Sequence, residues 1–468
     1  MTEPAFPTPE ERREYGRARR SVTPRSSLAE WSPGPDRPDP VELIAEQNVT
    51  RVPWLVPVRH ARMQVSAFTF YRGAARIMAA DLARTPVSGI EVQLAGDAHL
   101  ANFGAYASPE RKLVFDQNDF DETLPGPWEF DLKRLAASFV VASRFHGFTA
   151  ADGRAVAAEA ARVYRVAMQA FGELGFVDLW YDVIDVDHIS ALGGLPKKTL
   201  EERLARFQRK AEKRTSLQAL AKLAETVDGT WRIRSDPPYL VPLREIPDEQ
   251  GPDALMEAAR SAFEQYKDTI DDARHALLDR YEFIDAGIKV VGVGSVGTRC
   301  LVLLLRGRDE QDPLFLQVKE ADASVLEEHL APSRYDNHGQ RVVEGQRLVQ
   351  AQSDIFLGWT RGPLQGVNYY VRQLRDWKGS VDVEAPDMTP AQLGFYARLC
   401  GMTLARGHAR SGDAVAIAAY CGRGTGLDTA IAAFADAYAD QNDEDYARFR
   451  QAIADGRLPA APGDGSGA

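Results

Sequence analysis

Residues 94–136 limit the possible folds of this chain most strongly, because they combine short apolar runs with several acidic and amide side chains. One apolar run begins after Asn102, a polar turn follows at residues 108–110, and a second apolar run leads to a group of aspartates. Two such runs joined by a short polar turn predict a β-hairpin. This hairpin would bring Asp119 back next to Asn102, so that polar groups from both strands face one site.

The polar groups of the predicted hairpin suggest a site for a divalent ion. Carboxylate and amide oxygens suit a hard ion such as Mg²⁺, which keeps several waters and also binds phosphate oxygens. Asn102 and Asp119 are the expected ligands, and Asp116 and Asp121 are reserve ligands. Asp116 would point away from Asp119 if the strand continued through both. The alternative is that these side chains only bond the local backbone of turns.

The run from Gly96 to Asn102, GDAHLAN, resembles the catalytic loop HGDLHxxN of the aminoglycoside phosphotransferase and choline-kinase branch of the protein-kinase-like superfamily, with Ala95 in place of the first His. Asp97 and Asn102 also keep the interval of a kinase catalytic loop. The resemblance implies that Asp97 is catalytic, orienting or deprotonating an acceptor hydroxyl, and that ATP and Mg²⁺ are the cofactors.

Two further residues take their interpretation from the same resemblance. Asp131, in the run DLKRLA, follows Asp119 at the interval seen in that family, which implies a carboxylate that bonds backbone donors of the catalytic loop. His99 occupies a position that often serves loop packing there, and a contact with substrate or metal is the alternative.

The chain as a whole resembles the bacterial family catalogued as domain of unknown function 2252. It carries that family's motifs GDxHLxNFG, NDFDE and PWExDLKRLAxS. This resemblance covers most of the chain and implies no activity, whereas the kinase resemblance covers about half and implies the chemistry.

Composition narrows the class of protein. With 468 residues, 44% of them hydrophobic, the chain can bury one large core or two moderate ones. The net charge of −11 argues against general binding to nucleic acid or to an anionic membrane. Three scattered cysteines without metal-binding spacing fit a cytoplasmic setting. The sequence contains neither a signal-peptide pattern nor an apolar run long enough to span a membrane.

The N-terminal part, residues 1–58, is expected to be an extended segment. Residues 1–40 mix Arg, Glu, Ser and Pro, a composition typical of a mobile or surface-lying stretch. Residues 12–25 are basic within an acidic protein. This basic run is either a solvated tail or a binding segment for an anionic partner.

Residues 59–280 are expected to form a large helical lobe around the hairpin. Helical spacing of apolar residues predicts helices over residues 59–84, 128–145, 152–176, 197–228 and 253–279. Residues 237–245 read as a connector broken by prolines. Arg72 and Arg76, one helical turn apart, face either a phosphate or solvent. Acidic residues near His188 indicate turn chemistry, with a metal site as the alternative.

A change to alternating, β-branched sequence at residue 281 predicts a small β-rich lobe over residues 281–378 with five strands. Between its first two strands lies a GxGxxG run, which includes Gly292, Gly294, Ser295 and Gly297. A strand, not a helix, follows these glycines, so a dinucleotide-binding fold is disfavoured. The pattern is that of a kinase glycine-rich loop, whose backbone approaches nucleotide phosphates.

The next strand places Lys319 where a kinase lysine pairs with the α- and β-phosphates. Glu344, in a predicted helix at 339–352, is the expected partner of this lysine, and Glu327 and Glu328 are alternatives. Gln373 would begin the hinge beside the adenine, and Lys378 at its end would reach a phosphate or solvent.

Residues 379–456 are expected to form C-terminal helices that complete the large lobe, followed by a flexible tail at 457–468. A helix at 389–411 ends in a sequence that superficially resembles H-R-D, in which His408 and Arg410 could line the site and Asp413 supports it. Position 418, where a kinase has Asn, is Ala.

The sequence therefore predicts an α+β, protein-kinase-like fold with two lobes in circularly permuted order, because the glycine run and Lys319 follow the catalytic hairpin instead of preceding it. Permutation is tolerated where chain ends lie close together on a surface. The predicted function is ATP- and Mg²⁺-dependent transfer of phosphate to a hydroxyl of an unidentified small molecule or protein. The oligomeric state stays open.

Three other functions fit parts of the pattern. A kinase-fold nucleotidyltransferase would transfer AMP and release pyrophosphate. A pseudokinase would bind nucleotide without turnover. A metallophosphoesterase would need a GNH[DE] motif, which residues 336–339, DNHG, match poorly.

Overall fold

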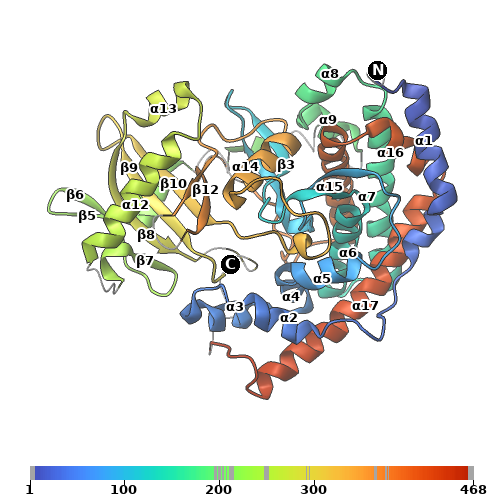
Figure 1. The fold of residues 1–468 in the computed structure, drawn as a ribbon, viewed down its shortest axis with the longest axis horizontal. Helices are drawn as coiled ribbons and strands as arrows, with labels where there is room; N and C mark the ends of the chain where they lie inside the picture. The colour runs from blue at the N-terminus through green and yellow to red at the C-terminus, as the bar shows by residue number, and fades with distance from the viewer. Residues whose placement is uncertain are drawn as a thin grey trace.

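The computed structural model describes residues 6–193, 215–246, 252–290, 296–362, 366–374 and 379–461, with isolated positions 198, 202, 205, 206, 208, 209, 292, 294 and 377. The fold is α+β. Figure 1 shows a β-sheet with its own helices on one side of the molecule and a larger body of helices on the other, with α14 between them.

The main sheet of the described chain has six antiparallel strands in the order β11-β12-β10-β9-β8-β7. Their bounds are β7 (Leu240–Pro242), β8 (Glu282–Lys289), β9 (Cys300–Arg306), β10 (Pro313–Glu320), β11 (Gly358–Arg361) and β12 (Asn368–Gln373). The sequence predicted five of them. The sixth, β7, was taken for part of a connector because of its prolines, but it lies at the edge of the sheet, where proline is tolerated.

Successive residues of a strand point to opposite faces of the sheet. Both faces are covered by other elements. On one face, Leu303 and Leu305 pack with Phe263 of α12 (Pro252–Lys267) and with α13 (Asp272–Leu278). On the other, Val302 and Leu304 pack with α11 (Ser216–Leu223) and the hairpin of β5 (Ala224–Val227) and β6 (Thr230–Ile233).

Helices α11, α12 and α13 and the β5–β6 hairpin therefore belong with the sheet, whereas the sequence placed them in the helical lobe expected over residues 59–280. The predicted helix at 197–228 lies partly outside the described residues. Its described part, α11, ends at Leu223, and β5 begins at Ala224. Asp228 and Gly229 have φ of 51° and 77°, which is the geometry of a tight hairpin turn.

The helical body is built on α6 (Glu129–Phe145), α7 (Ala150–Phe171), α15 (Pro390–Ser411), α16 (Ala414–Cys421) and α17 (Gly426–Ala454). Helices α6, α7 and α15 lie close to helices predicted from apolar spacing, α17 lies within the predicted C-terminal helices, and α16 was not predicted as a separate helix. Helices α7 and α15 approach closely at Gly401, where an added Cβ would lie 2.3 Å from the carbonyl oxygen of Ala160. Trp128 stacks on Tyr164 at the centre of this core, with 5.4 Å between the rings. Two short helices, α8 (Phe176–Tyr181) and α9 (Val186–Ala191), follow α7.

The N-terminal part is helical, so the expectation of an extended segment is wrong for residues 6–58. Its elements are α1 (Pro9–Val22), η1 (Arg25–Ala29), α2 (Pro40–Gln47) and η2 (Pro53–Leu55). Thr8 and Glu11 form a capping box at the start of α1, and Pro9 occupies its first turn. Helix α1 packs against α16, where Gly16 lies against the carbonyl of Ala416.

The helix predicted over residues 59–84 is three helices, α3 (Val56–Met63), α4 (Ala67–Gly73) and α5 (Ala75–Leu82). Helix α3 ends at Met63, and Ser66 caps the start of the next helix, α4. In the described part of the chain, no helix is long and apolar enough to cross a bilayer.

Candidate functional site

The predicted hairpin is present and forms the centre of the candidate site. Strands β2 (Phe103–Ala107) and β3 (Leu113–Gln117) are antiparallel, with Gly104 opposite Asp116. The pairing extends past the strands, because the N–H of Asn118 donates to the carbonyl of Asn102 at 3.0 Å. Asp119 therefore returns to Asn102, as the sequence predicted. A second pair, β1 (Glu91–Leu94) and β4 (Leu124–Pro127), flanks the hairpin.

Asp97 is held by a buried arginine of α6. The Nε and Nη2 atoms of Arg134 donate to the same carboxylate oxygen, Oδ1 of Asp97, at 2.8 and 2.6 Å. Asn102 donates its Nδ2 to the carbonyl of Asp97 at 2.8 Å, which fixes the orientation of its amide. Burial raises the pKa of Asp97, and the charge of Arg134 opposes this shift. One oxygen of Asp97, Oδ1, is thus fixed by Arg134.

The loop that carries Asp97 rests on Asp131. The carboxylate of Asp131 accepts hydrogen bonds from the N–H groups of Ala95 and Gly96 at 2.7 and 3.0 Å. The Nε2 atom of His408 lies 3.2 Å from Oδ2 of Asp131, and its Nδ1 atom lies 2.9 Å from the hydroxyl oxygen of Tyr164. Asp131 has the position that the kinase resemblance implied, and His408 supports it instead of lining the site.

His99 is buried in the same loop. Its Nδ1 accepts the N–H of Ala101 at 3.2 Å, and its Nε2 lies 3.7 Å from Oδ2 of Asp97. Burial holds the pKa of His99 well below its usual range, with the nearby positive charge of Arg134 acting in the same direction. A neutral imidazole that caps a turn agrees with the packing interpretation.

Lys319 reaches this site from β10. Its Nζ lies 2.6 Å from Oδ2 of Asp121 and 3.9 Å from Oδ1 of Asp119, and the side chain is 3% exposed. The hydroxyl of Tyr370, on the neighbouring strand, donates to the other oxygen of Asp121 at 2.6 Å. The two distant segments therefore meet in one cluster of charges.

The two aspartates of this cluster titrate differently. Burial raises the pKa of Asp119, and the negative charge of Asp121 raises it further. Burial also opposes ionisation of Asp121, but the ammonium of Lys319 outweighs it and lowers the pKa of Asp121 to about 2. Of these two aspartates, Asp119 is therefore the one whose negative charge is less well compensated.

The donor types at Asn102 and Asp119 are ones that a magnesium ion accepts. One amide and one carboxylate leave most coordination positions to water and phosphate oxygens, which is usual for Mg²⁺. An added cation would also offset the charge at Asp119. Among the described residues, no group of three or more His, Cys, Asp or Glu side chains is arranged to hold a metal. The site would therefore depend on a ligand to complete the coordination.

The glycine run lies between strands β8 and β9, and the structure describes Gly292, Gly294, Val296 and Gly297 of it. Gly292 and Gly297 have φ of 58° and 95°, which a side chain would strain. Arg62 donates to the carbonyl of Gly292 at 2.7 Å, and the N–H of Val52 donates to that of Gly297 at 2.7 Å. Ser295, expected to bind the cofactor, lies outside the described residues. Arg62 of α3 and Val52, just before η2, thus bond the backbone of two of these glycines. The sequence did not predict these contacts.

Arg72 lies between this turn and Asp97. Its carbonyl is 3.2 Å from the position of a Cβ added to Gly294, and its positive charge acts on the carboxylate of Asp97. The guanidinium pairs with Glu384 at 2.9 Å. Arg76 instead pairs with Glu46 and Glu328, away from the hairpin.

Glu344 is not the partner of Lys319, which corrects the sequence-based expectation. It pairs with Arg347 at 3.1 Å and lines a separate cleft with Gln93 and Trp180. The reason is the direction of the side chains around α14 (His338–Val349). Gly345 faces Thr123 and Gln93, and successive residues of a helix are turned by about 100°. The alternatives Glu327, in η5 (Val325–Glu328), and Glu328 contact other groups.

Gln373 lies at the edge of the same region. Its backbone N–H donates to Asp354 at 2.5 Å, and the residue lines a cavity of about 150 Å³ with Tyr106, Asn118 and Arg372. Asn118 precedes Asp119, so the cavity adjoins the acidic cluster. Lys378 lies outside the described residues.

Several residues that the sequence offered as possible site residues make structural contacts instead. Asp116 is buried against Arg406 at 2.5 Å, which makes it a poor reserve ligand. Asp413 caps α16, and Arg410 stacks on Trp180. Asn337 of the DNHG run caps α14, so this run does not form a phosphoesterase metal motif.

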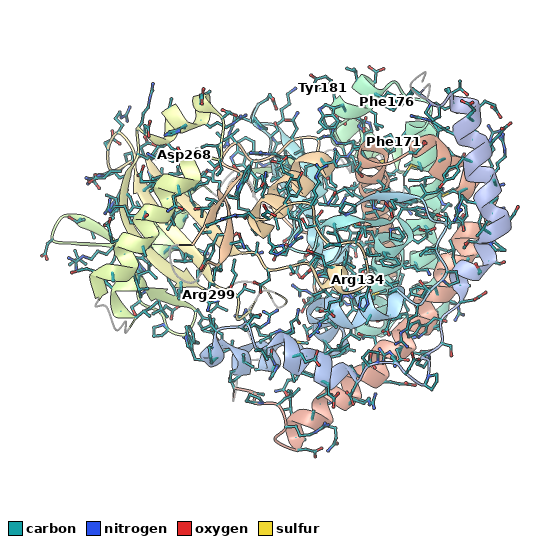
Figure 2. The ribbon with its side chains drawn as sticks, in the orientation of Figure 1. Arg134, Phe171, Phe176, Tyr181, Asp268 and Arg299 are labelled. Atoms are coloured by element: carbon teal, nitrogen blue, oxygen red, sulfur yellow. The ribbon has the colours of Figure 1, made fainter. Side chains whose placement is uncertain are left out.

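The residues that sequence reasoning missed are buried charged groups. Arg134 lies in a helix of mostly buried residues, where a charge needs a partner. An arginine at this position, three residues after Asp131, could therefore have been predicted to pair with a carboxylate. Arg341 donates to the carbonyls of Asp121 and Thr123 at 2.8 and 2.7 Å and ties α14 to the hairpin. Figure 2 shows Arg134 on the helical side of the molecule and Arg299 on the sheet side.

The comparisons with known proteins give one result. A family profile described as "Uncharacterized protein conserved in bacteria (DUF2252)" matches residues 51–452. No curated protein and no solved structure gives a significant match.

Proposed function

The chain belongs to the bacterial DUF2252 family, and we propose that it is an ATP- and Mg²⁺-dependent phosphotransferase of protein-kinase-like, circularly permuted fold. The observation that carries the proposal is the meeting of Lys319 with Asp121 and Asp119, because a lysine on a strand beside a metal-binding aspartate is the arrangement with which kinases hold nucleotide phosphates.

The order of elements supports this proposal. Strand β8, the glycine turn, β9, the lysine strand β10, helix α14 and strands β11 and β12 follow each other as in the small lobe of a kinase. All of them come after the loop that carries Asp97 and Asn102 and after the β2–β3 hairpin that follows it. An active site depends on geometry and not on chain order, so the permuted order is compatible with the same chemistry.

Each residue receives a defined task in this proposal. Asn102 and Asp119 would hold Mg²⁺, which supplies positive charge to the phosphates. Lys319 binds phosphate oxygens with its ammonium. The backbone of the Gly292–Gly297 turn approaches the triphosphate, and Gln373 adjoins the base.

Asp97 would orient the acceptor hydroxyl and accept its proton. Arg134 fixes Oδ1 of this carboxylate, which leaves Oδ2 for the acceptor. Catalysis in this class depends mainly on positioning and on neutralising charge. The proposed location is the cytoplasm, where ATP is abundant.

A thermal-shift titration with Mg-ATP tests the proposal. Nucleotide should raise the Tm of the parent and not that of Asp119→Ala. An unchanged Tm of the parent at millimolar Mg-ATP would count against nucleotide binding. Product analysis then separates the reactions, since phosphate transfer yields ADP and AMP transfer yields pyrophosphate.

One observation favours a second function, that of a nucleotide-binding pseudokinase. Arg134 places two donors on Oδ1 of Asp97, so one of the two oxygens of the proposed base is already bound by the protein. Nucleotide-induced stabilisation of the parent without turnover on any acceptor would support this alternative.

A further inference from the structure

A surface cleft of about 390 Å³ lies at the outer edge of the helical body. It is formed where α1 and η1 run beside α16 and the end of α7, on the side of the molecule away from the sheet (Figure 1). Its charged lining residues are Arg13, Arg17, Arg20, Arg25, Arg423 and Glu173. Five guanidinium groups and one carboxylate therefore surround one open space.

Two of these arginines are oriented by the end of α16. Arg20 donates its Nε to the carbonyl of Tyr420 at 2.9 Å, and Arg25 donates its Nη1 to that of Cys421 at 2.7 Å. These bonds satisfy the last carbonyls of the helix, which have no partner within it. They fix the two side chains in place without neutralising either charge fully.

Carboxylates compensate only part of the remaining charge. Arg13 pairs with Glu173 at 3.2 Å and Arg17 with Glu10 at 2.7 Å. Within the described chain, no carboxylate lies in ion-pair range of Arg20, Arg25 or Arg423. Burial lowers the pKa of Arg20, and the positive charges of Arg25 and Arg17 lower it further. The cleft is thus a concentrated positive site in a protein of net charge −11.

The spacing of the arginines favours a ligand with several negative groups. Arg13, Arg17 and Arg20 recur at helical intervals of four and three residues and so lie on one face of α1. Guanidinium groups bind phosphate oxygens through paired N–H donors. The volume of the cleft is within the range of small-molecule sites, roughly 300–1,000 Å³.

We propose that this cleft binds a small polyanion that carries two or more phosphate groups. The site is separate from the hairpin that carries Asp97, and it does not depend on the phosphotransferase proposal. It gives the basic run at residues 12–25 a binding function within a folded helix.

Calorimetry with inorganic tripolyphosphate, without Mg²⁺ and at constant ionic strength, tests the proposal. The full chain should bind it, and Arg17→Ala/Arg423→Ala should bind at least about tenfold more weakly, because each guanidinium supplies charge-assisted bonds. Both side chains are exposed, so the fold should survive their removal. Lys319→Met should keep the affinity of the parent, which separates this cleft from the candidate active site.

The matched control is Arg232→Ala/Arg457→Ala, which removes two exposed arginines elsewhere. Its affinity should equal that of the parent. The proposal is overturned if the parent does not bind tripolyphosphate, if Arg17→Ala/Arg423→Ala binds as tightly as the parent, or if the control loses as much affinity as the test variant.

Discussion

The ammonium of Lys319 lies 2.6 Å from a carboxylate oxygen of Asp121, across 198 positions of sequence. The side chain of Lys319 is 3% exposed and that of Asp121 is 30% exposed, and Tyr370 donates to the second oxygen of the same carboxylate. The pair therefore joins the sheet to the hairpin and places a positive charge beside Asp119.

Removing one partner of this pair should separate its structural contribution from its proposed function. Lys319→Met leaves the partly buried Asp121 without its main counter-charge and should lower the free energy of unfolding by about 1–3 kcal/mol, less than the cost of a fully buried unpaired charge. The double variant Lys319→Met/Asp121→Asn should regain much of this loss. Neither variant should be stabilised by Mg-ATP. Urea unfolding measures stability, and full nucleotide stabilisation of the double variant would contradict the assignment of Lys319.

Asp97 should be needed for turnover and not for nucleotide binding. Once an acceptor is known, Asp97→Asn should reduce kcat by about 10²–10⁴-fold, the usual contribution of a general base. The Tm increase with Mg-ATP should persist, because the amide keeps an oxygen for Arg134. Steady-state kinetics and thermal shift measure the two effects on the same preparation. Equal kcat values for variant and parent would exclude Asp97 as the base.

Glu344 provides a test of the corrected geometry of α14. Glu344→Gln should change nucleotide-induced stabilisation little, because this residue pairs with Arg347 on another face of the helix. Arg341→Met should lower both stability and nucleotide binding, since it removes three bonds to backbone carbonyls near Asp121. The kinase resemblance alone predicts the opposite, namely that Glu344→Gln loses more nucleotide-induced stabilisation than Arg341→Met. Thermal-shift measurements on both variants therefore distinguish the two predictions.

Local sequence signals predicted part of this molecule well. The alternation of apolar residues located β8, β9, β10 and β12, and the turn between two apolar runs located the hairpin. The start of α1 was also readable, because Thr8 and Glu11 have capping-box spacing, but the polar composition of the segment concealed it. The hairpin turn at Asp228-Gly229 was a second readable signal that the periodicity of the preceding helix obscured.

The pairing of buried charges could not be predicted in the same way. Asp116, Asp119 and Asp121 are similar in local sequence, yet one binds Arg406, one lies at the centre of the site and one binds Lys319. Their partners lie some two to three hundred residues away. Which partner each aspartate meets depends on the packing of α14 and α15 against the hairpin, and periodicity does not encode that packing.

Glu122 should give the stability of the protein a defined pH dependence. Burial raises the pKa of this carboxyl from 4.5 to about 7, against the opposing charge of Arg341. The folded chain then binds this proton more tightly than the unfolded chain, so the contribution is present below pH 4.5 and is lost as pH rises to about 7. Glu122→Gln keeps an acceptor for the N–H of Val325 and removes the titration.

The stability of Glu122→Gln relative to the parent should therefore increase between pH 5 and 7, by up to about 3 kcal/mol. Urea unfolding of both proteins at several pH values measures this difference. A difference that stays constant with pH would show that Glu122 is ionised in the folded protein at pH 5.

Asp116 and Asp119, three positions apart, should respond in opposite ways to the same substitution. Asp116→Asn leaves Arg406 buried without its carboxylate and should lower the free energy of unfolding by about 3–5 kcal/mol. Asp119→Asn removes a negative charge that burial and Asp121 disfavour, so stability should stay equal or rise by about 1 kcal/mol. Stabilisation by Mg-ATP should survive in Asp116→Asn and disappear in Asp119→Asn. Because each variant is the control for the other, loss of nucleotide binding in Asp116→Asn alone would move the proposed metal site to the opposite face of the strand.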